Sequence, residues 1–246
     1  MNKLNILITA GGTSEYIDAV RKITNSSSGK LGSIIANEFS QKNNINKIFY
    51  VCTPKSIKPN MSLIIKSGIN FKLYEITTTM ELKNVIEEIL INEKIDYFIH
   101  SMAISDYYVD YVSTASLLSK SLKESNNYEE TLKKPIYKLD NSSKLSSNED
   151  NLILVLKQTP KIIKMIKEIS PSTHLIGFKL LENVKEDELI EVGYNLLLKN
   201  NCDYVVANDL KNITNNKHIG FLIDKNKAYK KLKTKEEIAK ELTFII

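Results

Sequence analysis

The segment LNILITAGGT, residues 4–13, predicts a short buried strand that ends in a tight turn. Its apolar residues come first, and Gly11, Gly12 and Thr13 follow directly. This order is typical of the first strand of a parallel sheet, whose carboxyl end faces a ligand. The turn is not the dinucleotide fingerprint, because G-x-G-x-x-G needs a third glycine and a helix that opens at once. Its backbone N–H groups could instead form an anion-binding nest.

Strand-like and helical patterns alternate along the rest of the chain. Short apolar runs predict strands, and apolar residues three to four positions apart predict helices. We expect strands at 48–51, 71–74, 96–100, 152–156, 174–178, 203–207 and 221–224, the last at a sheet edge, and helices at 31–41, 79–91, 160–169, 185–199 and from Thr234. Such alternation predicts an α/β fold that is Rossmann-like and doubly wound, with a mostly parallel sheet covered on both faces.

One segment, at about 113–150, interrupts this alternation. It is dense in Ser, Asn, Lys and Glu, and its Lys-Lys-Pro and Asn-Ser-Ser triplets argue against one continuous element. A long insertion in a compact domain is either a functional lid or a disordered segment. We expect a flexible lid inserted into a single domain that spans residues 1–246.

The composition limits the possible classes of protein. Of the 246 residues, 42% are hydrophobic and 26% are charged, as in ordinary globular proteins. Two cysteines exclude a disulfide scaffold and favour a reducing compartment, so we expect a cytoplasmic protein. Three scattered histidines lack zinc-ligand spacing, so no metal site on the protein is expected. No apolar run approaches about 18 residues, so no membrane partner is expected either.

The net charge of +5 has two interpretations. A basic chain can attract nucleic acid or phosphorylated small molecules, or the charge can reflect a sequence rich in lysine throughout. No stripe of Arg and Lys alternates with aromatic residues, so we expect no nucleic-acid partner.

Two further places could carry chemistry. Ser27, Ser28 and Gly29 lead into the helix that starts near Lys30, and exposed N–H groups with two hydroxyls would make a phosphate cradle. The alternative is a plain serine-rich helix cap. Asp106 follows a strand end and could be a functional carboxylate or a helix N-cap. Nucleophilic catalysis has little support, because neither cysteine lies in a nucleophile motif.

Four blocks of sequence share, in order and spacing, the pattern of one enzyme family. The first is ITAGGTSEYIDAVRKITNSSSGKLG at 8–32, with its Gly-Thr turn, D-x-V-R step and serine-rich cradle. The others are SMAISDYYV at 101–109, KLSSNEDNLILVLKQTPKII at 144–163, and LIGFKLL with NCDYVVANDL at 175–181 and 201–210. Together they resemble phosphopantothenate–cysteine ligase in its free-standing bacterial form, which is similar to the C-terminal part of DNA/pantothenate metabolism flavoproteins. Because the chain begins at the first strand of the ligase, we expect no flavin-dependent domain and no flavin.

The resemblance implies a ligase that joins 4′-phosphopantothenate to L-cysteine in coenzyme A biosynthesis. CTP would activate the carboxylate as an acyl-cytidylate and release pyrophosphate, and the cysteine amine would then displace CMP. Mg²⁺ would accompany CTP by bridging phosphate oxygens. The implied partners are these small molecules, a second copy in a homodimer, and a separate flavin-dependent decarboxylase that acts next in the pathway. Strand-like pieces at 208–231 could pair across the twofold axis of the dimer.

The resemblance also assigns roles to residues. Asn25 and Lys144 would be catalytic, with the Asn25 amide beside the acyl group and Lys144 on a flap that meets the phosphates. The substrate would contact Gly11, Gly12, Thr13, Arg21, Asn25, Ser27, Ser28, Gly29, Met102 and Ala103. The nucleotide would contact Asp106, Lys144, Pro160, Lys161, Ile162, Ile163, Phe178 and Lys199. Tyr194 and Leu196 stand where related ligases carry lysines.

Two other classes of protein share the expected architecture. An NAD-type oxidoreductase would need the glycine fingerprint and an acidic residue after the second strand, where Cys52-Thr53-Pro54 occurs. A non-catalytic nucleotide-binding protein would not need both Asn25 and Lys144. Formation of pyrophosphate from CTP, phosphopantothenate and cysteine separates the three functions.

Overall fold

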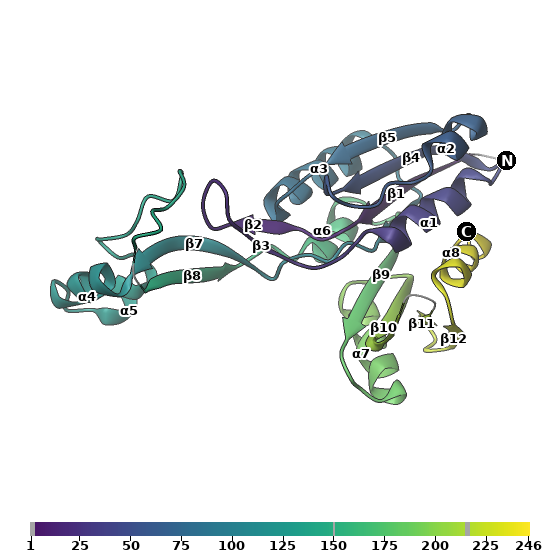
Figure 1. Ribbon diagram of the computed structural model, residues 1–246. Helices are drawn as coiled ribbons and strands as arrows, with labels where there is room; N and C mark the ends of the chain where they lie inside the picture. The colour runs from purple at the N-terminus through teal and green to yellow at the C-terminus, as the bar shows by residue number, and fades with distance from the viewer. Residues whose placement is uncertain (1–2, 150, 215–216) are drawn as a thin grey trace.

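The computed structural model describes residues 3–149, 151–214 and 217–246, and the main sheet has eight strands within these ranges (Figure 1). Its order is β12-β11-β10-β9-β6-β1-β4-β5. The strands are β1 (Leu4–Ala10), β4 (Ile45–Cys52), β5 (Asn70–Glu75), β6 (Tyr97–His100), β9 (His174–Leu181), β10 (Tyr204–Ile213), β11 (His218–Asp224) and β12 (Tyr229–Leu232). The six strands from β5 to β10 pair in parallel, and β11 and β12 add antiparallel pairs. The predicted mostly parallel α/β fold is therefore confirmed.

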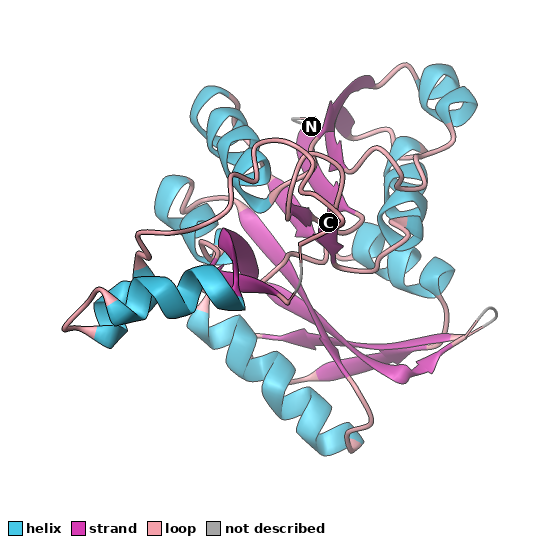
Figure 2. Ribbon diagram, turned by 60° about the vertical axis from the view of Figure 1, so that its left-hand side comes forward, coloured by secondary structure: helices cyan, strands magenta, loops and turns pink. Residues whose placement is uncertain are grey.

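Both faces of the sheet are covered, as Figure 2 shows. Successive side chains of a strand point to opposite faces, so Ile6 and Ile8 pack with α1 (Lys30–Ser40) and α8 (Lys235–Phe244). Leu7 packs on the other side with α3 (Thr79–Asn92) and α6 (Ile162–Ile169). Helix α7 (Glu186–Lys199) packs on β10 and β11, and α2 (Met61–Ser67) lies beside α1. No helix of the described residues is both long enough and apolar enough to span a bilayer.

The strand order places a topological switch at β1. From β1 the chain continues to β4 and β5 on one side of the sheet, and then returns to β6, β9 and β10 on the other. Because β1 and β6 are adjacent and parallel, the loops that follow them begin side by side at the same edge of the sheet, before the chain turns to opposite sides. Ligands of doubly wound proteins bind in the crevice at such a point.

A long two-stranded ribbon projects from the body of the molecule, with two helices at its outer end (Figure 1). It consists of β7 (Tyr107–Thr114) and β8 (Leu152–Gln158), and the helices are α4 (Ala115–Lys123) and α5 (Tyr128–Lys133). The strand expected at 152–156 exists, but it pairs antiparallel with β7 and not within the main sheet. Much of the expected lid at 113–150 is thus helix and strand, its last residue lies outside the described ranges, and its flexibility stays a prediction.

Three local expectations are corrected. The strand expected at the sheet edge is β11, which lies between β10 and β12, so the pieces at 208–231 pair with one another in this chain, and pairing across a twofold axis stays a prediction. Helix α6 begins at Ile162 with Lys161 as its N-cap, so Pro160 precedes the helix. A hairpin of β2 (Ser14–Tyr16) and β3 (Lys22–Thr24) follows β1, where the sequence predicted only a polar stretch.

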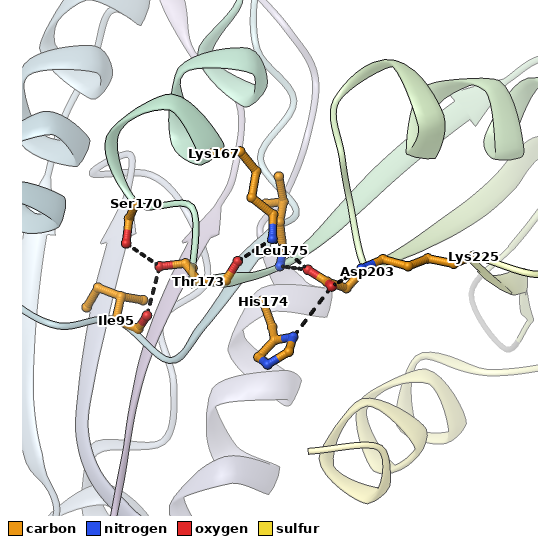
Figure 3. A network of polar contacts seen from close by, with 8 residues as sticks. All are labelled: Ile95, Lys167, Ser170, Thr173, His174, Leu175, Asp203 and Lys225. Atoms are coloured by element: carbon orange, nitrogen blue, oxygen red, sulfur yellow. Dashed lines mark hydrogen bonds and ion pairs between the residues drawn. The ribbon is translucent and has the colours of Figure 1, made fainter.

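The amino ends of the strands are joined by a polar network around Asp203 (Figure 3). The Asp203 carboxylate, 11% exposed, accepts hydrogen bonds from the Leu175 N–H at 2.8 Å, the Lys167 ammonium at 2.9 Å and the Lys225 ammonium at 2.6 Å. The Lys167 ammonium also donates to the Thr173 carbonyl. Burial alone would raise the pKa of Asp203, but these bonds outweigh it and lower the pKa to about 2. The network ties α6, β9 and β10 to the turn before β12.

Replacing Asp203→Asn should therefore destabilise the fold. The amide can still accept from Leu175 N–H, but the nearly buried Lys167 ammonium loses its counter-charge, so the free energy of unfolding should fall by about 2–4 kcal/mol. The matched control is Lys225→Gln, which removes a partner that is 61% exposed and should cost at most about 1 kcal/mol. Urea unfolding of the three proteins measures both values. Equal losses in the two variants would show that Lys167 does not depend on Asp203.

Candidate functional site

The loops after β1 and β6 are hydrogen-bonded to each other at the switch point. The Ala103 N–H donates to the Gly11 carbonyl at 2.8 Å, and the Thr13 N–H donates to the Ala103 carbonyl at 3.0 Å. The Ser105 N–H in turn donates to the Thr13 hydroxyl at 2.8 Å. Parallel pairing thus continues beyond the strand ends and brings together two predicted substrate-binding segments that are far apart in the sequence.

Position 12 requires glycine because the backbone of another segment, at Asn25, passes directly over it. A Cβ on Gly12 would lie 1.9 Å from the Asn25 carbonyl oxygen, and the Asn25 N–H donates to the Thr13 carbonyl at 3.1 Å. The Asn25 side chain is oriented by its Nδ2, which donates to the Ile104 carbonyl at 3.0 Å. Asn25 is therefore held at the crossing of the two loops, beside Gly11, Gly12 and Ala103.

The third component of the site is the N-terminus of α1. Its N-cap is Gly29, in the left-handed conformation with φ +73°, and within the described chain no side chain caps the helix. The expected alternative, a serine N-cap, is therefore wrong, although the Ser28 hydroxyl accepts a long 3.4 Å bond from the Lys30 N–H. A Cβ on Gly29 would lie 3.3 Å from the Gly11 nitrogen, so this terminus contacts the β1 loop. Its free N–H groups suit an anion.

Positive charge gathers beside this helix terminus. Lys30 is the first residue of α1, and Lys235 is the first residue of α8, which packs against α1. Burial and the nearby charge of Lys30 lower the pKa of Lys235. Because two ammonium groups close enough to disfavour each other would both be stabilised by a bound anion, the cluster adds to the anion affinity of the helix N-terminus.

Two hydroxyls complete the cradle and were not expected from the sequence. Thr53 and Ser56 follow β4, and their Oγ atoms lie 2.7 Å apart. Both face Gly11, where a Cβ would lie 1.9 Å from the Ser56 Oγ and 2.9 Å from the Thr53 Oγ1. The signal that could have found them is the strand order, because β4 is the neighbour of β1 and its carboxyl end lies at the same edge.

The predicted flap lysine lies beside the β2–β3 hairpin. Lys144 is exposed, and the next residue, Leu145, is buried and bonded to the hairpin turn. The Arg21 guanidinium forms an ion pair with Asp18 at 2.6 Å and donates to the Leu145 carbonyl at 3.0 Å. Arg21 thus attaches the flap to the hairpin, and its contact with substrate stays a prediction.

Two residues expected at the nucleotide are paired with each other. The Lys161 ammonium contacts the Asp106 carboxylate at 2.5 Å, with side chains that are 61% and 69% exposed. The Asp106 carbonyl also accepts from the Thr159 N–H at 3.0 Å, next to Pro160. Since β7 and not a helix follows Asp106, its alternative interpretation as a helix N-cap is wrong.

Several expected contact residues point elsewhere. The side chains of Met102 and Ile162 are buried in the core on the α3 and α6 face, so any contact of these two residues with a ligand would come mainly from their backbone and stays a prediction. Phe178 of β9 packs on the α1 face, whereas Ile163 of α6 packs on the opposite face, next to Gly177, because successive residues of a strand face opposite ways. The Phe178 and Ile163 side chains thus lie on opposite faces of the sheet, whereas the resemblance implied that they line the nucleotide base together.

Lys199, which was expected at the nucleotide, lies at a different edge of the sheet. It is the last residue of α7, and this helix returns from the carboxyl end of β9 to the amino end of β10. Lys199 therefore lies at the sheet edge opposite the switch point and not with the other site residues. Lys179, half-buried near the carboxyl end of β9, is one of the lysines that the topology places at the edge of the switch point.

The histidine at the end of β6 belongs to the core. His100 ends β6, and its Nδ1 lies 2.9 Å from the Thr9 hydroxyl. Burial lowers the pKa of His100 to about 4, so the ring is neutral at physiological pH. In the described part of the chain, no group of three His, Cys, Asp or Glu side chains is placed to hold a metal ion.

The doubly wound sheet and the anion cradle at its switch point define a Rossmann-like ligand-binding domain. The chain belongs to the family described as DNA/pantothenate metabolism flavoprotein C-terminal domain, which it matches over residues 1–134 and 137–246. A crystal structure of the DNA/pantothenate metabolism flavoprotein from Streptococcus pneumoniae is 37% identical, with a TM-score of 0.82 over 98% of this chain and 97% of that one. The expected family is thereby confirmed.

Curated relatives give the same family relationship. The coenzyme A biosynthesis bifunctional protein CoaBC of Thermococcus kodakarensis is 31% identical over 238 residues, which are 96% of this chain and 49% of that protein. The chain thus spans about half the length of the curated relatives it matches. A structure described as a Cab2 H337A mutant in complex with phosphopantothenate-cysteine, 20% identical with a TM-score of 0.67 over 98% of this chain and 86% of that one, shares the fold.

Substituting Gly12→Ala should disrupt the cradle. The added methyl group would overlap the Asn25 carbonyl, so the backbone around Asn25 must shift, and affinity for 4′-phosphopantothenate, the substrate expected at Gly12, should fall by about tenfold or more. Gly68→Ala is the control, because a Cβ there meets nothing within 4 Å although φ is +68°. Isothermal titration with 4′-phosphopantothenate measures the affinity of both variants. Wild-type affinity in Gly12→Ala would show that the Asn25 crossing is not part of the binding site.

Proposed function

We propose that this chain joins 4′-phosphopantothenate to L-cysteine in coenzyme A biosynthesis, with CTP as the activating nucleotide. The observation that carries the proposal is the convergence of the Asn25 amide, the β1 loop and the α1 N-terminus, together with the Lys30–Lys235 pair at the start of α1. Such a ligase must bind a phosphate and a triphosphate around one acyl group, and this arrangement offers anion-binding groups around one neutral amide. Family membership, and relatives named for coenzyme A biosynthesis, support the same activity.

Asn25 would act on the acyl group. With one Nδ2 hydrogen engaged by the Ile104 carbonyl, the amide keeps a second N–H donor and its oxygen acceptor in a fixed orientation. When the cysteine amine attacks the activated acyl carbon, the acyl oxygen becomes an oxyanion and the amine must lose a proton. A preorganised N–H donor stabilises that oxyanion, while the amide oxygen can hold the attacking amine.

Lys144 and Asp106 would act on the nucleotide. Lys144 projects from the flap as an exposed cation, which suits the negative charge that shifts onto pyrophosphate in the first step. Asp106 can exchange its exposed partner Lys161 for the exocyclic amino group of cytosine, because an exposed ion pair is weak. Lys161 is then available to the phosphates.

Mg²⁺ would enter with the nucleotide. Since the described residues offer no carboxylate cage, we propose that Mg²⁺ is held mainly by the triphosphate, where it neutralises phosphate charge. The residues that bind the phosphates are then the N–H groups of the α1 terminus and the lysines beside it. The homodimer and the decarboxylase partner stay predictions.

Comparison of the four nucleoside triphosphates tests this function. With phosphopantothenate and Mg²⁺, CTP should release pyrophosphate, and cysteine should then yield CMP and the amide product. UTP should be worse by about tenfold or more, because it places a carbonyl oxygen against the Asp106 carboxylate where CTP places an amino group. Release of pyrophosphate is measured with a coupled phosphate assay. No pyrophosphate with any of the four nucleotides would refute the ligase.

The two catalytic residues should affect different steps. Lys144→Gln should slow pyrophosphate release about tenfold or more even without cysteine, because it removes a charged donor from the triphosphate. Asn25→Ala should still release pyrophosphate in a burst, while product formation slows by about 10²–10³-fold and the acyl-cytidylate accumulates. Rapid quenching in a single turnover separates the two products. Lys138→Gln removes an exposed charge from the same flap and is the control. If Lys144→Gln and Asn25→Ala slow both steps equally, the two residues act as one unit.

A further inference from the structure

We propose that Asp18 is a positioning residue that, together with Arg21, holds the flap against the β2–β3 hairpin and thereby sets the place of Lys144. The inference rests on the proposed function for its catalytic consequence, but the attachment itself is a property of the chain. It gives a role to Asp18, the aspartate of the D-x-V-R step, that the resemblance did not assign.

The Asp18 carboxylate is the centre of a tight turn. Its Oδ1 accepts from the backbone N–H groups of Val20 at 2.9 Å and Arg21 at 2.7 Å. Its Oδ2 accepts from the Arg21 Nε at 2.8 Å and from the Leu145 N–H at 3.1 Å. The carboxylate is buried, so every one of these donors replaces a water molecule that it would otherwise bind.

Leu145 is bonded at both of its backbone polar groups. Its N–H donates to Asp18, its carbonyl accepts from the Arg21 Nη2 at 3.0 Å, and its side chain is buried. A third bond joins the same two segments, since the Asn141 Nδ2 donates to the Ile17 carbonyl at 2.9 Å. The flap is therefore attached to the hairpin turn on both sides of residues 142–144.

The charge of Asp18 makes this attachment persistent. Burial alone would raise the pKa of Asp18, but the bonds from Arg21 and from three backbone N–H groups outweigh it and hold the pKa well below its usual range. The carboxylate thus stays ionised at any physiological pH, and hydrogen bonds to an ionised acceptor are about twice as strong as neutral ones.

The position of the attachment explains what it would do for catalysis. Lys144 is adjacent to the anchored Leu145, so its backbone is confined while its exposed side chain can still reach for the phosphates. The same hairpin continues through β3 to Asn25. The D-x-V-R turn thus connects the two proposed catalytic residues, and holding them in place before substrate binds lowers the entropy cost of the reaction.

Limited proteolysis tests the attachment without any substrate. Asp18→Asn keeps the volume and one acceptor but turns an N–H₂ donor toward the Leu145 N–H and Arg21. Trypsin should then cut after Lys138 and Lys144 at least about tenfold faster than in the wild-type protein. Asp140→Asn is the matched control, because Asp140 is an exposed flap carboxylate that accepts only from Ser142 among its described contacts and should leave the cutting rate unchanged. Equal cutting of wild type and Asp18→Asn would overturn the proposal.

Kinetics test the positioning role. At a temperature at which all variants are fully folded, Asp18→Asn should slow pyrophosphate release, and the double variant with Lys144→Gln should be no slower than Lys144→Gln alone. If the two substitutions slow pyrophosphate release by factors that multiply in the double variant, Asp18 acts only through general stability, which contradicts the proposal. If Asp18→Asn does not fold, Arg21→Lys replaces it, because lysine can pair with Asp18 but cannot also reach the Leu145 carbonyl. A wild-type protein without pyrophosphate release would refute the proposed function, whereas proteolysis would still decide the attachment.

Discussion

The backbone crossing between Gly12 and Asn25 is the constraint on which the site depends. A single methyl group on Gly12 would lie 1.9 Å from the Asn25 carbonyl, so the two segments can cross only where one of them has no side chain. The crossing brings the end of β3 over the end of β1 and fixes Asn25 next to the loop after β6 through the Ile104 carbonyl. The Asn25 amide, which we propose to be catalytic, is thus positioned by backbone groups, which cannot rotate away as side chains can. Gly29 repeats this solution at the α1 terminus, where it packs against Gly11 and Ser56.

Polar groups at the two edges of the sheet differ: those at the amino edge stabilise the fold, and those at the carboxyl edge form the candidate site. At the amino edge, Asp203 is saturated by two ammonium groups and a backbone N–H, and its polar atoms serve the fold. At the carboxyl edge, the helix N-terminus lacks a side-chain cap within the described residues, and two lysines approach each other. Uncompensated donors and like charges cost stability in the free protein, and a bound anion would relieve both. An anion should therefore bind at the carboxyl edge and not at the amino edge.

Elements with strong local patterns were predictable from the sequence. The buried runs of β1, β4 and β9 and the apolar faces of α1, α3 and α7 lie within a few residues of the expected ranges. Strand β7 was missed because Asp110 interrupts its apolar residues and Ser113 and Thr114 end it, and its pairing with β8 became clear only in three dimensions. The three-residue strands β2 and β3 are too short to show a period, and the hairpin is fixed by the Asp18 turn rather than by strand propensity.

Site residues could be predicted from the sequence where they directly follow a strand. They could not be predicted where their role depends on the edge or the face of the sheet on which they lie. Gly11, Gly12, Thr13 and Ala103 meet as expected because they follow adjacent parallel strands. Lys199 was assigned through the resemblance, which does not say at which edge of the sheet the last residue of α7 lies. Thr53 and Ser56 were missed because their role depends on β4 being the neighbour of β1. Met102 was assigned through its place in a motif, whereas alternation along the chain turns its side chain into the core.

The hydrogen bonds of the insertion limit which part of it can act as a lid. The Tyr137 N–H donates to the Ser121 hydroxyl at 3.0 Å, and the Leu139 N–H donates to the Val112 carbonyl at 2.9 Å, so the segment after α5 is fastened to the ribbon. From Asn141 to Leu145 the chain is fastened to the hairpin instead. Between and after these attachments, residues 142–144 and 146–149 are exposed. Movement that brings Lys144 to a nucleotide therefore requires only these short segments and the lysine side chain, while α4, α5 and the ribbon can stay in place. A lid of this size loses little conformational entropy on closing, because few residues have to be ordered.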